Sequence, residues 1–173
     1  MINTTWNKTP ADLTVIPCEN YQRDMPWQET GLSFVASSPN MPHLITAQHY
    51  PGACLIEGTT LSEGRGTALP FEITGAPYID GRQLADHLNR LDLPGVRFRA
   101  HGFIPTASKY TGEQCDGIQA HIINHAIYRP FETWLHVIRA IRHIYPDDFA
   151  WLLPYSEGAL QHFDRLVGSD TVR

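Results

Sequence analysis

The sequence predicts an α+β fold, in which a mixed β-sheet packs against two or three helices. Segments with strand periodicity and segments with helical periodicity follow one another without a strict strand–helix–strand alternation. The chain has 173 residues, of which 42% are hydrophobic and 18% charged, so it can bury one sizeable core. An α/β sheet is the alternative fold class.

Five segments have the composition or the alternation of strands. In the fourth of them Val96, Phe98 and Ala100 alternate with Arg97 and Arg99, which predicts one buried and one exposed face. The second is a short apolar run that would be buried and would end at Glu57. The predicted strands are residues 13–19, 53–57, 70–75, 95–105 and 117–124.

Three segments predict helices. Residues 80–91 place Leu84, Leu88 and Leu91 at helical spacing, and Asp80 is positioned to cap the first turn. Residues 156–168 predict a short last helix with Ser156 as its N-cap. The longest helix is predicted for residues 130–145, where Pro130 suits the first turn and Pro146 ends the helix. Its apolar stripe consists of Phe131, Trp134, Leu135, Ile138, Ile141 and Tyr145.

Between the first two predicted strands lies a long polar segment, residues 20–52. It contains four prolines and the sequence SSPNMP, which predicts irregular structure. A loop of this length inside a compact domain is usually functional or lies over another surface.

Composition excludes several classes of partner. The net charge is −5 and no basic stripe is present, so no nucleic-acid partner is expected. No apolar run approaches the roughly 20 residues that span a bilayer, so no membrane partner is expected. Residues 1–13 lack the pattern of a signal peptide, which makes the cytoplasm the default location. A periplasmic or secreted location is the expectation if an upstream signal is missing.

The three cysteines Cys18, Cys54 and Cys115 are far apart and odd in number. We expect buried, reduced thiols and no disulfide framework. Nine histidines are present, but no pair has the spacing of a known metal motif. The sequence therefore predicts no metal and no cofactor.

Residues 56–72, IEGTTLSEGRGTALPFE, contain the first candidates for chemistry. At the end of a buried strand the Glu57 carboxylate would be partly desolvated, which would raise its pKa toward that of a general acid or base. The alternative is that Glu57 accepts hydrogen bonds from backbone amides of the glycine-rich turn.

Glu63 and Arg65 lie in the same stretch, and Gly64 and Gly66 flank the arginine. Glycine allows the backbone to approach a ligand, and an arginine there suits two-point binding of a carboxylate or phosphate. The alternative is an internal Glu–Arg salt bridge.

A second loop, residues 105–117, holds Lys109 and Tyr110. These side chains could bind an acidic or hydroxylated ligand. The alternative is a solvated lysine beside a tyrosine that packs against the core.

Seven motifs in order carry a resemblance to a known family: DLTVIPCENYQRDM, SPNMP, YPGACLIEGTTLSEGRGTALPFEITGAPYID, LPGVRF, FIPTASKY, GIQAHI and GSDTVR. Together they resemble the exo-β-N-acetylmuramidase (NamZ-type) family, long catalogued as a domain of unknown function. The resemblance implies hydrolysis of terminal N-acetylmuramic acid (MurNAc) from peptidoglycan fragments. The expected partner is therefore a muropeptide or another MurNAc-containing sugar.

The resemblance also implies two lobes with the substrate cleft between them. Residues 1–50 would be the end of the N-terminal lobe and a segment that wraps the interface, and residues 51–173 the C-terminal α+β lobe. The catalytic carboxylate of the family would lie in the part of the N-terminal lobe that this chain lacks. The resemblance implies a cleft-lining role for Glu57, Ser62, Glu63, Arg65, Thr67, Lys109 and Tyr110.

Three functional hypotheses follow. The first is a substrate-binding lobe, inactive alone, in which Arg65 or Lys109 holds the lactyl carboxylate of MurNAc. The second is a stand-alone carbohydrate-binding or interaction module without catalysis. The third is a complete small hydrolase whose catalytic pair is Glu57 and Glu63, since glycoside hydrolysis ordinarily uses two carboxylates.

Overall fold

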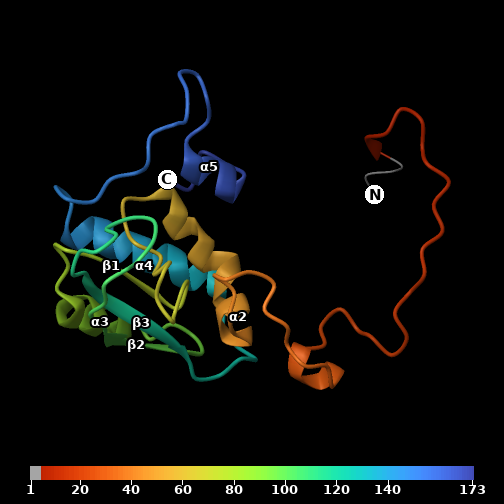
Figure 1. The fold of residues 1–173 in the computed structure, drawn as a ribbon, viewed down its shortest axis with the longest axis horizontal. Coiled ribbons are helices and arrows are strands. Elements are labelled where there is room, and N and C mark those ends of the chain that lie inside the picture. Colours follow the sequence, from red (N-terminus) through yellow and green to blue (C-terminus); the bar gives the residue numbers. More distant parts are fainter. Residues whose placement is uncertain (1–4) are drawn as a thin grey trace. The chain divides into compact units, whose positions relative to one another are not determined.

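The computed structural model describes residues 5–173, and the chain divides into two units, residues 1–34 and residues 35–173 (Figure 1). The α+β prediction is confirmed: the second unit combines a three-stranded antiparallel sheet with four helices, α2 to α5. Across residues 5–173 no helix is both long enough and apolar enough to cross a bilayer.

The first unit is mostly irregular. Among its residues 6–34 the structure describes one short element, the 3₁₀ helix η1, Trp27–Thr30, which ends at Gly31 in the left-handed conformation at φ 70°. The Trp27 indole Nε1 donates a hydrogen bond to the carbonyl of Leu32 at 3.0 Å, and its ring meets Phe34 edge-on. This indole therefore stabilises a local turn.

The predicted strand at residues 13–19 is wrong. These residues form no strand, and Val15 and Ile16 expose 74% and 88% of their surface. A β-branched composition favours a strand only where another strand is available to pair with it. Cys18 in this segment is exposed, so the expectation of a buried thiol is wrong there; Cys54 is half-buried and Cys115 is buried.

The sheet of the second unit has the strand order β1-β3-β2, and both pairings are antiparallel. Strand β1 is Ile73–Ala76, β2 is Val96–Ala100 and β3 is Asp116–Ile122. Three of the five strand predictions are therefore confirmed, with boundaries moved by up to five residues. In β2, Val96 and Phe98 are buried while Arg97 and Arg99 are exposed, as the alternation predicted.

Two helices match the sequence pattern closely. Helix α3, Gly81–Arg90, is capped by Asp80, whose Oδ1 accepts hydrogen bonds from the amides of Arg82 and Gln83. Helix α4, Pro130–Ile144, begins with its proline in the first turn. One predicted apolar residue at the end of each helix is wrong. Leu91 and Phe131 are not buried, since they expose 42% and 43% of their surface.

The predicted strand at residues 53–57 is also wrong. The prediction of irregular structure for residues 20–52 is wrong at the end of that segment, where a helix forms. Helix α2 is Leu44–Ala53 and continues as the 3₁₀ helix η2, Cys54–Gly58. Pro51 lies inside α2 and removes a backbone donor. A Cβ on Gly52 would lie 2.1 Å from the Pro130 carbonyl oxygen, so this glycine allows α2 to contact α4.

The last helix is shorter than predicted. Helix α5 is His162–Val167, and Gly168 ends it in the left-handed conformation at φ 79°. Its N-cap is Gln161, so the prediction of Ser156 as N-cap is wrong. Phe163 of α5 is buried and packs against the Trp151 ring.

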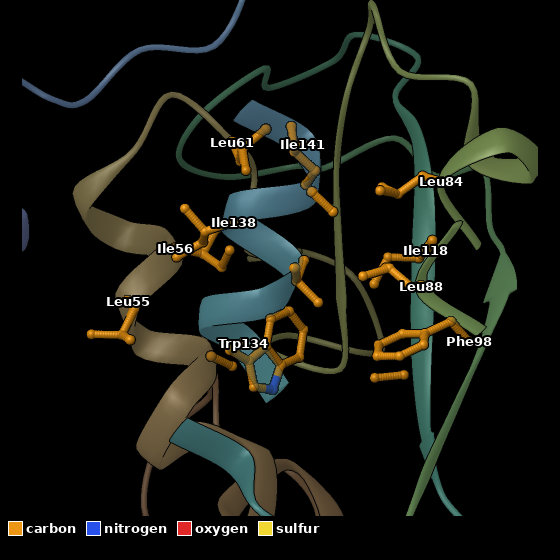
Figure 2. Packing of buried hydrophobic residues seen from close by; sticks show 14 of the residues in the cluster. Leu55, Ile56, Leu61, Leu84, Leu88, Phe98, Ile118, Trp134, Ile138 and Ile141 are labelled. Atoms are coloured by element: carbon orange, nitrogen blue, oxygen red, sulfur yellow. The ribbon is translucent and has the colours of Figure 1, made fainter. Parts of the chain in front are cut away.

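One main hydrophobic core joins these elements (Figure 2). Helix α4 lies between the α2–η2 segment and the layer formed by α3 and the sheet. Trp134, Ile138 and Ile141 of α4 are buried together with side chains from both sides. The core thereby fixes η2, at whose end the candidate site begins. The labelled partners are Leu55, Ile56, Leu61, Leu84, Leu88, Phe98 and Ile118.

Candidate functional site

Glu63 is the centre of an ion-pair cluster. Its side chain is 3% exposed, although it lies in a loop. Oε1 lies 3.0 Å from Arg65 Nε and accepts a hydrogen bond from the Ser108 hydroxyl at 3.1 Å. Oε2 lies 2.9 Å from Lys109 Nζ. A buried carboxylate requires such compensation, because the desolvation of an isolated charge is costly.

Arg65 connects Glu63 to Glu57. Its Nε faces Glu63, and its Nη2 donates to the Glu57 carboxylate. The guanidinium also lies over the Phe71 ring, 5.0 Å from the centroid. Burial lowers the pKa of Arg65, but the bonds to the two glutamates outweigh burial and the net shift is upward. Arg65 therefore serves two internal carboxylates, as the salt-bridge alternative described.

Lys109 enters the cluster from the second loop. Its Nζ donates to the carbonyl oxygens of Ile56 and Thr59, at 3.1 and 3.0 Å, in addition to its ion pair with Glu63. Burial lowers the pKa of Lys109, and the nearby Glu63 carboxylate opposes that shift. The lysine thus links the end of η2 to the glycine-rich turn.

Both glycines that flank Arg65 adopt the left-handed backbone conformation. Gly64 and Gly66 both have φ of 75°, which L-residues rarely adopt. A Cβ on Gly66 would lie 2.5 Å from the Ala107 amide nitrogen. The Gly66 carbonyl accepts a hydrogen bond from the Thr106 hydroxyl at 2.7 Å. The two loops are therefore in direct backbone contact at this point.

Ser62 and Thr67 stabilise the same turn from within. The buried Ser62 hydroxyl accepts from the Gly64 amide at 3.2 Å, and its backbone pairs with Gly75 of β1. The Thr67 hydroxyl donates to the Gly64 carbonyl at 2.6 Å and accepts from the Leu69 amide. Both hydroxyls form hydrogen bonds with the backbone of the turn, and a ligand would compete with these bonds.

Tyr110 lies beside the ion pairs without joining them. It is half-buried and packs against a small apolar cluster of Ile73, Phe103 and Cys115. Tyr110 and the nearby Ser108 have positive φ, 58° and 68°, although neither is glycine. Such strained residues concentrate at functional or tightly constrained sites.

The structure thus gathers Glu57, Glu63, Arg65 and Lys109 into one cluster and places the other three predicted residues around it. Two carboxylates face two cations, so the cluster is charge-balanced. Glu57 keeps 21% of its side chain exposed, whereas Glu63 is enclosed. Roles of these residues in catalysis or substrate binding stay predictions.

Sequence reasoning missed two members of the cluster. Phe71, at φ 62°, supplies the ring beneath Arg65, and its amide donates to the Glu63 carbonyl at 2.8 Å. Ser108 supplies a hydroxyl to the Glu63 carboxylate. The sequence did contain a signal for Ser108, because it is adjacent to the predicted site residue Lys109 in the same loop.

Three cavities in the described part of the chain lie along α4. The largest, about 640 Å³, lies between α3 and α4 and is lined by histidines and arginines, among them His87, His136 and Arg139. The others measure about 340 and 270 Å³. None of the three is lined by a predicted site residue. Within residues 5–173 no group of three or more His, Cys, Asp or Glu side chains is arranged to hold a metal.

Comparison with protein families gives two matches that together cover nearly the whole chain. Residues 48–173 match the family described as exo-beta-N-acetylmuramidase NamZ, C-terminal. Residues 1–45 match the family described as exo-beta-N-acetylmuramidase NamZ, N-terminal.

Individual relatives agree with these matches. The chain is 45% identical over 163 residues to the peptidoglycan beta-N-acetylmuramidase NamZ of Bacillus subtilis (strain 168). That alignment covers 94% of this chain and 38% of the relative, so the chain spans well under half the relative's length.

Two solved structures from Bacteroides fragilis, both described as DUF1343 family proteins, are also similar. One has a TM-score of 0.76 at 33% identity and covers 81% of this chain and 37% of its own. The other has a TM-score of 0.58 at 26% identity and covers 94% of this chain and 40% of its own.

Proposed function

The chain belongs to the exo-β-N-acetylmuramidase NamZ family, and from this membership we propose that residues 51–173 act as the C-terminal substrate-binding lobe of such an enzyme. In this proposal the lobe forms one wall of a cleft for a MurNAc-containing sugar from peptidoglycan. The wall is built from the glycine-rich turn at residues 62–67 and the loop at residues 105–112. Residues 1–50 form the end of the N-terminal lobe and the segment between the lobes.

The observation that carries the proposal is the cluster around Glu63. Two loops that are distant in sequence are tied together by ion pairs of Arg65 and Lys109 with one buried carboxylate. Rigid, mutually supported loops suit sugar recognition, because a preorganised site loses little conformational entropy on binding. In this arrangement Glu63, Arg65 and Lys109 hold the wall in shape.

The cluster supports binding better than chemistry by this chain alone. A glycosidase nucleophile or general acid must reach the glycosidic bond, and the Glu63 carboxylate is enclosed by two cations and Ser108. Glu57 is more exposed, but it shares the Arg65 guanidinium with Glu63. We therefore propose that the catalytic carboxylate comes from the N-terminal lobe of the family.

The test is hydrolysis of a chromogenic β-MurNAc glycoside. The chain alone, the N-terminal domain of the Bacillus subtilis relative alone, and their mixture would be assayed in parallel. We expect turnover that depends on the N-terminal domain and increases when this chain is added. Turnover by the isolated chain would overturn the proposal in favour of a complete small hydrolase.

A further inference from the structure

The sheet carries a polar face that the proposed function has not used. Phe98 and Ala120 pair across β2 and β3 and point into the main core. On the same two strands Arg99 pairs with Gln119, and Arg97 pairs with His121. Because side chains alternate along a strand, these residues lie on the opposite face of the sheet.

Arg99 is held on this face by neutral groups. Its Nε and Nη2 both donate to the Gln119 side-chain oxygen, at 3.0 and 2.6 Å, and Nε also lies 3.2 Å from His121 Nε2. Gln119 is only 8% exposed, so it is a fixed support. Within residues 5–173 no carboxylate pairs with Arg99, and its guanidinium charge is not neutralised by the protein.

The other arginines near the site differ in this respect. Arg65 is paired with two glutamates, and Arg97 lies 2.7 Å from the Asp92 carboxylate. Arg99 is oriented by Gln119 and keeps the far edge of its guanidinium, including Nη1, directed away from that support. An arginine fixed in this way suits a planar carboxylate, because its donors match both oxygens.

The electrostatics of the neighbouring histidines agree with this geometry. Burial, and next the Arg99 charge, lower the pKa of His121 and of His101. The net shift favours the neutral imidazole in both residues, and a neutral His121 Nε2 can accept a hydrogen bond from Arg99. The Glu72 carboxylate opposes the shift at His121 and Asp116 opposes it at His101, but neither carboxylate forms an ion pair with Arg99.

This face adjoins the glycine-rich turn. Ile73 of β1 pairs with Gln119 in the sheet register. A Cβ on Gly64 would lie 2.5 Å from the Ile73 side chain, so Ile73 separates Gln119 from the turn. Ile73, Gln119 and Arg99 therefore follow one another across the three strands, and a ligand must extend past Ile73 and Gln119 to reach from the turn to Arg99.

We propose that Arg99, positioned by Gln119, binds the carboxylate of the peptidoglycan fragment that this lobe recognises. The inference rests on the proposed function and assigns the carboxylate to Arg99 in place of Arg65. The carboxylate could belong to the lactyl ether of MurNAc or to a peptide attached to the sugar. Arg99 touches the ligand in this proposal, and Gln119 acts through Arg99.

The test is an NMR titration of the ¹⁵N-labelled chain, with the Arg99 Nε–H signal assigned from its loss in Arg99→Lys. The ligands are MurNAc, N-acetylglucosamine (GlcNAc, which lacks the lactyl group) and an alanine dipeptide. We expect MurNAc to shift the Arg99 and Gln119 side-chain signals, and GlcNAc to leave them in place. A shift with the dipeptide alone would assign the carboxylate to peptide.

Three variants separate the role of Arg99 from those of its neighbours on the same face. Arg99→Gln should lower MurNAc affinity about tenfold or more, as expected for a charge-assisted bond, and leave GlcNAc affinity unchanged. Arg97→Gln, two residues away on the same face, should change neither. Gln119→Met should move the Arg99 Nε–H signal without ligand and weaken MurNAc binding less than Arg99→Gln does.

Two results would overturn the inference, and they are distinguishable. If both sugars bind but Arg99→Gln weakens them equally, Arg99 does not hold a carboxylate and the proposed function survives. If neither sugar nor dipeptide binds the wild-type chain, both the inference and the sugar-binding role fail.

Discussion

Lys109 Nζ lies 2.9 Å from Glu63 Oε2, and this ion pair joins two loops that are far apart in the sequence. The carboxylate is 3% exposed and the lysine side chain 20%. The other oxygen of the Glu63 carboxylate, Oε1, lies 3.0 Å from Arg65 Nε. Removal of the Glu63 charge would leave Lys109 without a carboxylate partner and Arg65 with Glu57 alone.

Glu63→Gln should lower the free energy of unfolding by about 3 kcal/mol, because Arg65 and Lys109 would keep their charges in a partly desolvated site. The side chain keeps its shape, so the loss reports charge rather than packing. Urea unfolding followed by tryptophan fluorescence measures it. The control is Asp92→Asn, which breaks the exposed pair with Arg97 and should cost less than about 1 kcal/mol. Equal losses in the two variants would contradict a buried ionic cluster.

Gly66→Ala tests the contact between the two loops. The variant places a Cβ 2.5 Å from the Ala107 amide nitrogen and also strains a backbone at φ 75°. Gly112→Ala is the matched control, since its φ is 81° and nothing lies within 4 Å of the new Cβ. The control should lose about 1–2 kcal/mol from conformation alone. Gly66→Ala should lose roughly a further 1–3 kcal/mol from the clash, measured by the same unfolding assay.

Much of the fold could be predicted because its signals are local. The Asp80 cap, the apolar stripe of α4 and the alternation in β2 all lie within one segment. The prolines of residues 20–52, Pro51 among them, led to the prediction of irregular structure, because proline usually ends a helix. Here Gly52 serves a close contact with Pro130, which no local pattern encodes.

The site could be predicted in part for the same reason. Glu63 and Arg65 are two residues apart, so their ion pair was a stated alternative. The ion pair of Lys109 with Glu63 depends on the contact between two loops that are far apart in sequence. No local sequence pattern indicates that contact. The support of Arg99 by Gln119 likewise depends on the register of β2 against β3.

Leu88→Ala should cost about 3 kcal/mol, because its side chain is fully buried between α3 and the core shown in Figure 2. Leu91, immediately after the same helix, is 42% exposed. Leu91→Ala should therefore cost less than about 1 kcal/mol. Thermal unfolding of the two variants measures the difference. A comparable loss in both would mean that the helical stripe continues to Leu91, as the sequence pattern alone suggested.

His49 predicts a dependence of stability on acid pH. The side chain is fully buried, its Nδ1 lies 2.7 Å from the Tyr128 hydroxyl, and burial, with a smaller effect from His121, lowers its pKa from 6.5 to about 4. Between these values the unfolded chain binds a proton that the folded chain does not. The contribution of His49 to the free energy of unfolding is therefore fully present above about pH 6.5. It is lost as the pH falls from 6.5 toward 4. The difference between the two pKa values corresponds to about 3 kcal/mol.

The comparison is between wild type and His49→Gln, each unfolded in urea at several pH values from 7 to 4. The variant should be less stable at pH 7, since it loses the packing beside Tyr128, but its stability should fall less steeply with acid. Carboxylates and the other histidines titrate in both proteins, so their effects cancel in the difference. His143→Gln, at an exposed position near the end of α4, should keep the wild-type slope. Parallel curves for wild type and His49→Gln would show that His49 is not held neutral by burial.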